Sequence, residues 1–238
     1  MELVITLIVT IALTLALREP IRKAPWVFYL IALALDVMLL LGLSSNLPAF
    51  WRDLLVVTMR KGALGVALFA VVMWIGVLPR DGKLSKWLRP IRAELSIIAC
   101  ILIAGHMATY LGVYISRLFS PAPIKAQVTA ALIIALLLLL LILVLGITSF
   151  RFAKRRMSAK NWRKLQKLAY VFYGLVFIHV MLMLAPSIFQ GSKAALVTVI
   201  VYAVIFGGYI IARIWRAVID KRDQVDLDAS VREQGFEN

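Results

Sequence analysis

The sequence contains a single cysteine and only two histidines among its 238 residues. The lone Cys100 excludes a disulfide framework, a CxxC pair and a CxxCH attachment motif. No GxGxxG fingerprint is present, so we expect no dinucleotide-binding domain within the chain. Acidic residues are also few, because 12 Asp and Glu stand against 27 Lys and Arg. The basic residues lie between apolar runs, which indicates membrane topology rather than a nucleic-acid partner.

Apolar residues are what the sequence has in excess. Hydrophobic residues make up 63% of the chain and its mean hydropathy is +0.93, values typical of integral membrane proteins. A helix needs about 20 residues to cross a bilayer, and it satisfies its own backbone groups there. We therefore predict an all-α, seven-helix transmembrane bundle in the cell (inner or cytoplasmic) membrane, with the lipid bilayer as its first partner. The expected spans are residues 2–17, 25–43, 62–79, 94–116, 126–147, 165–185 and 194–215, of which the first is the shortest.

The basic residues orient these spans. Loops 18–23, 80–92 and 151–167, together with the C-terminal end, carry 21 Lys and Arg, and the remaining loops carry 6. Because Lys and Arg are enriched in cytoplasmic loops, this split predicts an N-terminus outside and a C-terminus inside. We expect residues 1–218 to form the transmembrane domain. Residues 219–238 are polar and mixed in charge, and we expect a short, disordered cytoplasmic tail there.

The two histidines lie at one depth in the expected bundle. His106 follows Leu95 by 11 residues in the fourth span, and His179 follows Leu168 by 11 residues in the sixth. Both spans run in the same direction, so each imidazole lies roughly 16 Å into the bilayer at about 1.5 Å per residue. A single histidine here would more often be a packed core residue. Two at matched depth on different helices favour a functional pair, as ionisable residues within membranes usually do.

Neutral imidazole is a common axial ligand of haem iron. The pair therefore predicts one b-type haem, held without covalent attachment, with His106 and His179 as its metal ligands. A bare transition metal would need more ligands than two imidazoles supply. Ligation by one histidine and one methionine stays open, because Met107, Met181 and Met183 are close in the sequence. No arrangement of serine, cysteine or paired carboxylates predicts a catalytic residue.

Two further residues are candidates at the cofactor site. Asp36 stands alone in an apolar run, 11 residues past Pro25, and so falls in the histidine layer. Its carboxylate could accept the second N–H of a ligating histidine, relay a proton, or simply bond to a helix carbonyl in its protonated form. Arg60 begins the third span on the outer side, where it could meet an anionic haem propionate or lie at the interface as an ordinary snorkelling residue.

Three stretches carry a resemblance to a known family: RPIRAELSIIACILIAGHMATY (89–110), LGITSFRFAKRRMSAKNWRKLQKLAYVFYGLVFIHVMLM (145–183) and, more weakly, MRKGALGVALFAVVMWIGVLPR (59–80). The chain resembles the ferric reductase-like transmembrane superfamily, in particular the YedZ/MsrQ-type haem-binding membrane subunits of bacterial methionine sulfoxide reductase systems. The resemblance implies a six-helix core, with the first segment as an addition. It also implies that His106 and His179 bind b-type haem, and that an arginine near position 60 belongs to the pattern.

The chain departs from that family at two positions. Relatives often carry another histidine 13 residues before the later one, where this chain has Gln166, and two-haem relatives carry one near the start of the fourth span, where it has Arg92 and Ala93. With two histidines in all, we expect one haem. Electrons must then come from a separate donor, which could be quinol, a bound flavin such as FMN, or a partner protein. The basic loop 151–167 could hold a flavin phosphate, or only contact anionic lipid.

Two functions follow as hypotheses. In the first, the chain is an electron-transfer subunit of an oxidoreductase system, and it passes electrons from quinol or flavin to an extracytoplasmic reductase partner or to ferric iron. In the second, it is a small non-redox membrane transporter in which Asp36 and the two histidines form a proton or ion path. Broken helices would favour a transporter.

Overall fold

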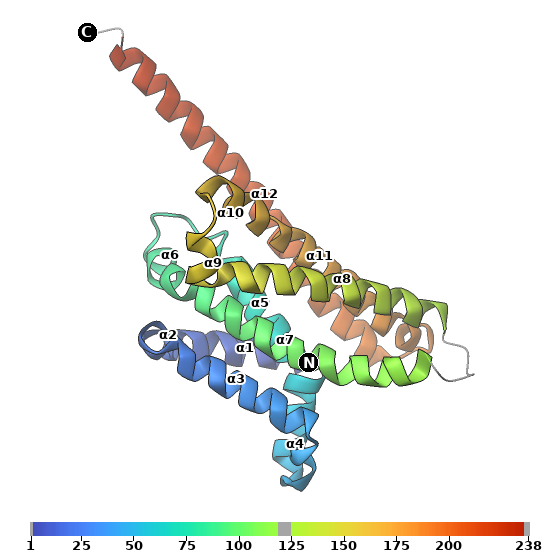
Figure 1. The fold of residues 1–238 in the computed structure, drawn as a ribbon. Helices are drawn as coiled ribbons and strands as arrows, with labels where there is room; N and C mark the ends of the chain where they lie inside the picture. The colour runs from blue at the N-terminus through green and yellow to red at the C-terminus, as the bar shows by residue number, and fades with distance from the viewer. Residues whose placement is uncertain (1, 119–124, 236–238) are drawn as a thin grey trace.

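A computed structural model of the chain describes residues 2–118 and 125–235. Within them, seven long helices occupy the seven apolar segments (Figure 1). An apolar environment offers no partner for backbone N–H and C=O groups, which is why these segments are helical. The long helices are α1 (Glu2–Ala16), α3 (Pro25–Leu40), α5 (Ala63–Ile75), α7 (Arg92–Leu118), α8 (Ala126–Ser149), α11 (Leu168–Phe189) and α12 (Lys193–Gly235).

Four stretches are long and apolar enough to cross a bilayer: Lys83–Ile115, Ala126–Ser149, Ala159–Phe189 and Lys193–Arg222. A fifth is added if the bent pair Ala49–Arg60 and Ala63–Ile75 counts as one span. The apolar helices Leu3–Ala16 and Pro25–Leu40 are shorter than a span requires. The chain is therefore an all-helical, multi-pass membrane protein. The count of seven spans and the N-out orientation stay predictions.

Short helices gather toward one end of the bundle, at the left of Figure 1. They are α2 (Arg18–Lys23), α6 (Lys83–Leu88), α9 (Arg151–Arg155) and α10 (Ala159–Gln166). A 3-10 turn, η3 (Arg89–Ile91), joins α6 to α7. These elements come from the three basic loops of the sequence, and we call this part of the bundle the basic end.

The core is built around α5. Every residue of α5 except Leu64 and Trp74 is buried, so this helix is apolar on all sides, as a central helix must be. It packs against α1 and α7, and α7 also packs against α3 and α8. In turn α11 lies between α8 and α12. As a result α8 joins the two helices that carry the histidines.

A helical break precedes α5 where the sequence predicted only a loop. After a 3-10 turn, η1 (Leu43–Asn46), α4 (Ala49–Leu55) continues into a π-helical turn, η2 (Val56–Arg60). The chain then bends by 50° before α5. Gly62 makes the bend with a φ of +73°, a left-handed conformation that glycine adopts without a Cβ penalty.

The last helix extends through the range predicted as a tail. α12 continues to Gly235, and residues 236–238 lie outside the described part of the chain. The division of the chain at residue 218, and disorder beyond it, stay predictions.

Candidate functional site

His106 projects from the middle of α7 toward the break before α5. Its Nδ1 lies 2.7 Å from the carbonyl oxygen of Arg60. The ring also lies against Gly62, because a Cβ added there would be 3.2 Å from both Cγ and Nδ1 of the imidazole. One turn further along α7, the ring of Tyr110 lies 5.1 Å away between centroids. The imidazole is therefore held from α7 itself and from the chain that enters α5.

His179 projects from α11 toward the first turns of α8. Its Nδ1 lies 3.1 Å from the carbonyl oxygen of Ala131. Each histidine thus contacts a backbone carbonyl of a neighbouring segment, and their pairing at one haem stays a prediction.

The backbone carbonyls that contact the two imidazoles determine which ring nitrogen carries the proton. A carbonyl oxygen can only accept a hydrogen bond, so each Nδ1 must carry the proton and donate it. The neutral ring then has its free lone pair on Nε2, which is the state of a histidine ligand whose other nitrogen is bonded to the backbone. Each imidazole can give one nitrogen to a metal ion without breaking its existing bond.

The number of ligands separates the possible metal groups. Within the part of the chain that the structure describes, no group of three or more His, Cys, Asp or Glu side chains converges on one point. Haem iron takes four ligands from its porphyrin and up to two from the protein, so two side chains are enough for a six-coordinate site. His106 and His179 supply two imidazole nitrogens in the right tautomer, so the donor set fits a haem.

Asp36 lies on α3 beside the residue that precedes His106. The side chain is 4% exposed, and its carboxylate lies so close to Gly105 that a Cβ at that position would overlap it. Its Oδ1 has no hydrogen-bond partner among the described residues. The Nδ1 proton of His106 goes to the Arg60 carbonyl, so Asp36 is not the acceptor of that proton. Its place in the histidine layer agrees with the sequence, and its role stays a prediction.

Arg60 takes part in the site through its backbone. Its carbonyl oxygen accepts from His106, whereas the residue as a whole is exposed. The contact between the Arg60 guanidinium and a propionate, which the sequence suggested, stays a prediction.

Comparison with protein families finds a partial match. Residues 61–177 match the model of a family described as "Ferric reductase like transmembrane component". This segment is similar to ferric reductase-like transmembrane components. It contains α5, α7 and α8, carries His106, and its match ends two residues before His179.

A relative extends the similarity over nearly the whole chain. An uncharacterized protein of Treponema pallidum (strain Nichols) is 32% identical over 221 residues, which is 92% of this chain and 61% of that protein. The chain therefore spans about three fifths of the length of the relative it matches. No solved structure matches the chain.

Side-chain hydrogen bonds at the basic end join the last turn of α8 to α10. Trp162 donates from Nε1 to the Thr148 carbonyl at 3.0 Å. Gln166 donates from Nε2 to the Thr148 hydroxyl at 3.1 Å. The Ser158 side chain caps α10 by accepting from the Asn161 N–H at 3.2 Å. The pattern therefore closes the loop between α8 and α11, and Gln166 occupies the position of the missing histidine.

Arg92, the other departure from the family pattern, is bonded to the backbone of α5. Its Nε donates to the carbonyl of Val72 at 3.0 Å, and its Nη2 would lie 3.1 Å from a Cβ at Gly76. This contact ties the start of α7 to the central helix and gives Arg92 a structural role.

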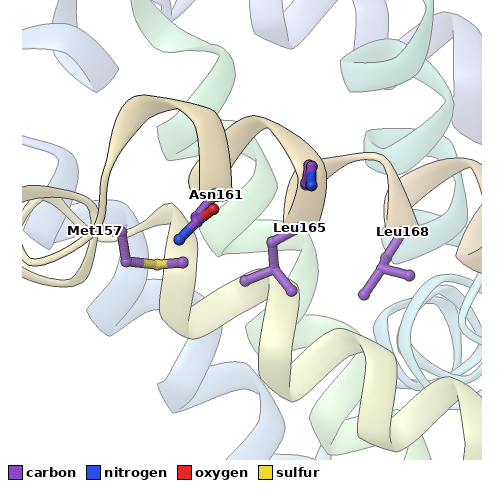
Figure 2. A pocket seen from close by; sticks show the side chains of 5 residues that line it. Met157, Asn161, Leu165 and Leu168 are labelled. Atoms are coloured by element: carbon purple, nitrogen blue, oxygen red, sulfur yellow. The ribbon is translucent and has the colours of Figure 1, made fainter.

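A pocket of about 420 Å³ opens beside α10. Met157, Asn161, Leu165 and Leu168 line it, as Figure 2 shows, and Lys164 adds a cation. An apolar lining with one ammonium group suits an amphiphilic molecule that has an anionic end, such as a lipid or a flavin phosphate.

Sequence reasoning missed the groups that hold the histidines. Arg60 and Ala131 act through carbonyl oxygens, which every residue has, so no residue type could signal them. Gly62 had a detectable signal, because a glycine directly before an apolar helix often marks a left-handed turn.

Proposed function

We propose that this protein is a membrane electron-transfer subunit that holds one b-type haem between His106 and His179. The observation that carries the proposal is the contact of both Nδ1 atoms with backbone carbonyls. Because a carbonyl only accepts, these contacts favour Nδ1–H tautomers, which leave both Nε2 atoms available as ligands. When bound, a haem with two imidazole ligands supplies a one-electron couple and has no open position for oxygen.

The chain's own residues would orient and shield the group. The carbonyls of Arg60 and Ala131 hold the ring planes, and the apolar faces of α7, α8 and α11 exclude water. Arg60 would lie near a propionate. Asp36, which lies beside Gly105, would relay a proton.

The proposed electron donor and electron acceptor are molecules separate from this chain. It carries no nucleotide-binding fingerprint, so electrons would enter from quinol or from FMN bound at the basic end. The pocket beside Lys164 is one place for the flavin phosphate. The acceptor would be an extracytoplasmic reductase partner or ferric iron, in keeping with the resemblance to YedZ/MsrQ-type subunits, and the membrane would be the cytoplasmic one.

One observation favours a second candidate. The Oδ1 of Asp36 is buried without a hydrogen-bond partner among the described residues, and such a carboxylate in a membrane helix often belongs to a proton or ion path. In that case Asp36 and the histidines would serve a small transporter that has no pigment.

The test is the colour of the purified protein. The protein is produced with ample haem, and its reduced-minus-oxidised spectrum is recorded with extraction of the pigments. We expect one b-type haem per chain, lost in His106→Ala and in His179→Ala, while membrane insertion is unchanged. Met181→Leu is the matched control, because it removes one of the three candidate methionine ligands and should keep the haem. A colourless, folded wild-type protein would overturn the proposal and favour the transporter.

A further inference from the structure

The helical break before α5 ends at Arg60, whose carbonyl oxygen accepts a hydrogen bond from His106. In η2 the Lys61 N–H bonds to the Val56 carbonyl at 3.0 Å, and the Gly62 N–H bonds to the Met59 carbonyl at 2.9 Å. The next backbone bond into α5 runs from the Val66 N–H to the Gly62 carbonyl, at 3.0 Å. The Arg60 carbonyl therefore lies between two hydrogen-bond patterns and can point sideways, toward the Nδ1 of His106.

Gly62 meets two demands at once. Its φ of +73° disfavours an ordinary side chain on conformational grounds. A Cβ there would also lie 3.2 Å from the imidazole of His106, closer than an ordinary van der Waals contact. Without a side chain at residue 62, the ring reaches the Arg60 carbonyl with no crowding.

The break is also anchored from behind. Met59, one residue before Arg60, is 2% exposed and belongs to the hydrophobic core. This anchor limits how far the Arg60 carbonyl can move relative to α7. Breaks of this π-helical kind are costly to a regular helix and are frequent at functional sites.

We infer that the break at residues 56–62 is a positioning device for His106, in which the Arg60 carbonyl holds the Nδ1 proton and Gly62 makes room for the ring. Gly62 is thus a positioning residue for the proposed ligand. The ligand role of His106 rests on the proposed function, whereas the position and tautomer of the ring stand on the contacts alone. His179 has no such device, since its partner is the carbonyl of Ala131 within the regular helix α8.

The chain offers a matched control for Gly62. Gly42 has a similar positive φ, +69°, but a Cβ there would meet nothing within 4 Å. Gly62→Ala and Gly42→Ala therefore both place a side chain at a positive φ, and only the first also crowds an imidazole. Asparagine tolerates the left-handed region better than alanine, so Gly62→Asn and Gly42→Asn repeat the comparison with less risk to folding.

The first readout needs no haem. The chain has only two histidines, so ¹⁵N-histidine NMR of the haem-free protein gives two imidazole signal sets, which His179→Gln assigns. We expect Nδ1–H tautomers for both rings in the wild type. The Gly62 variants should shift His106 away from that tautomer and leave His179 unchanged, and the Gly42 variants should change neither. An unchanged His106 in the Gly62 variants, or an equal change in the Gly42 variants, overturns the inference.

The second readout uses the pigmented protein. Loss of the bond to the Arg60 carbonyl makes the imidazole a weaker electron donor, so Gly62→Ala should move the midpoint potential to more positive values, and Gly42→Ala should not. If the wild type binds no haem, the proposed function fails and the NMR comparison still decides the positioning device. If it binds haem and both glycine variants keep the wild-type potential, the inference fails while the proposed function stands.

Discussion

Two side chains thirteen residues apart, Gln166 and His179, make similar contacts with opposite ends of α8. Gln166 donates to the Thr148 hydroxyl near the end of that helix, and His179 donates to the Ala131 carbonyl near its start. The bonds have the same length, 3.1 Å in each case. What differs is the atom left over: the imidazole retains a nitrogen with a lone pair, and the amide does not.

This difference shows that packing and ligand capacity are separate properties of the fold. A glutamine at position 166 preserves the connection between α8 and the following helices without an imidazole that could bind iron. The bundle can therefore keep its architecture at both ends while the proposed metal ligands lie at one.

The largest effect expected outside the ligands comes from crowding the helix contact beside His106. Gly105→Ala would place a Cβ on the Asp36 carboxylate, so the Asp36 side chain or α3 itself must shift, at a cost of about 1–3 kcal/mol. Gly174→Ala is the control, because a Cβ there would meet nothing within 4 Å. Thermal unfolding in detergent, followed by circular dichroism, measures both. Equal stabilities of the two variants would contradict the close contact of α3 and α7.

A smaller effect is expected at the basic end. Trp162→Phe removes the Nε1 bond to the Thr148 carbonyl and weakens the contact with the Lys154 ammonium, which lies 4.4 Å from the ring. We expect a loss of about 1 kcal/mol and an unchanged haem content. The same unfolding assay and the haem spectrum report the two quantities. A large loss of haem in this variant would mean that the two ends of the bundle are not independent.

The smallest effect is expected at Gln166, and it tests the comparison of Gln166 with His179 most directly. Gln166→Ala removes the donor to the Thr148 hydroxyl, which still donates to the Val144 carbonyl. The change should cost about 0.5–1 kcal/mol, with one haem per chain retained. His179→Ala, at the other end of the same pair of helices, should lose the haem altogether. Haem stoichiometry by pigment extraction separates these outcomes, and loss of haem in both variants would show that Gln166 also serves the site.

The positions of the long helices could be predicted from the sequence because hydropathy alone determines which segments avoid water. The expected spans 94–116, 126–147 and 165–185 agree with α7, α8 and α11 to within a few residues. The break at 56–62 could not be predicted in this way. Its shape depends on a contact with His106, more than 40 residues further along the chain, and a local pattern contains no record of such a contact.

Some groups of the candidate site could be predicted from the sequence and others could not. Side chains of rare type, such as His106, His179 and Asp36, stand out in an apolar sequence and were found. The carbonyls of Arg60 and Ala131, which determine the tautomers, have no such signature. In the sequence Gln166 is only a departure from a family pattern. Its bond to Thr148 depends on how the loop between α8 and α11 folds.

The burial of α5 has a consequence for how the bundle assembles. Lipid acyl chains surround α5 directly after its insertion. Neighbouring helices must replace them during assembly, because almost none of the helix surface stays exposed. A photoreactive group at Phe69 or Val71, both buried, would then label lipid before assembly and protein afterwards. The change from lipid to protein adducts would time the maturation of the membrane domain from a single position.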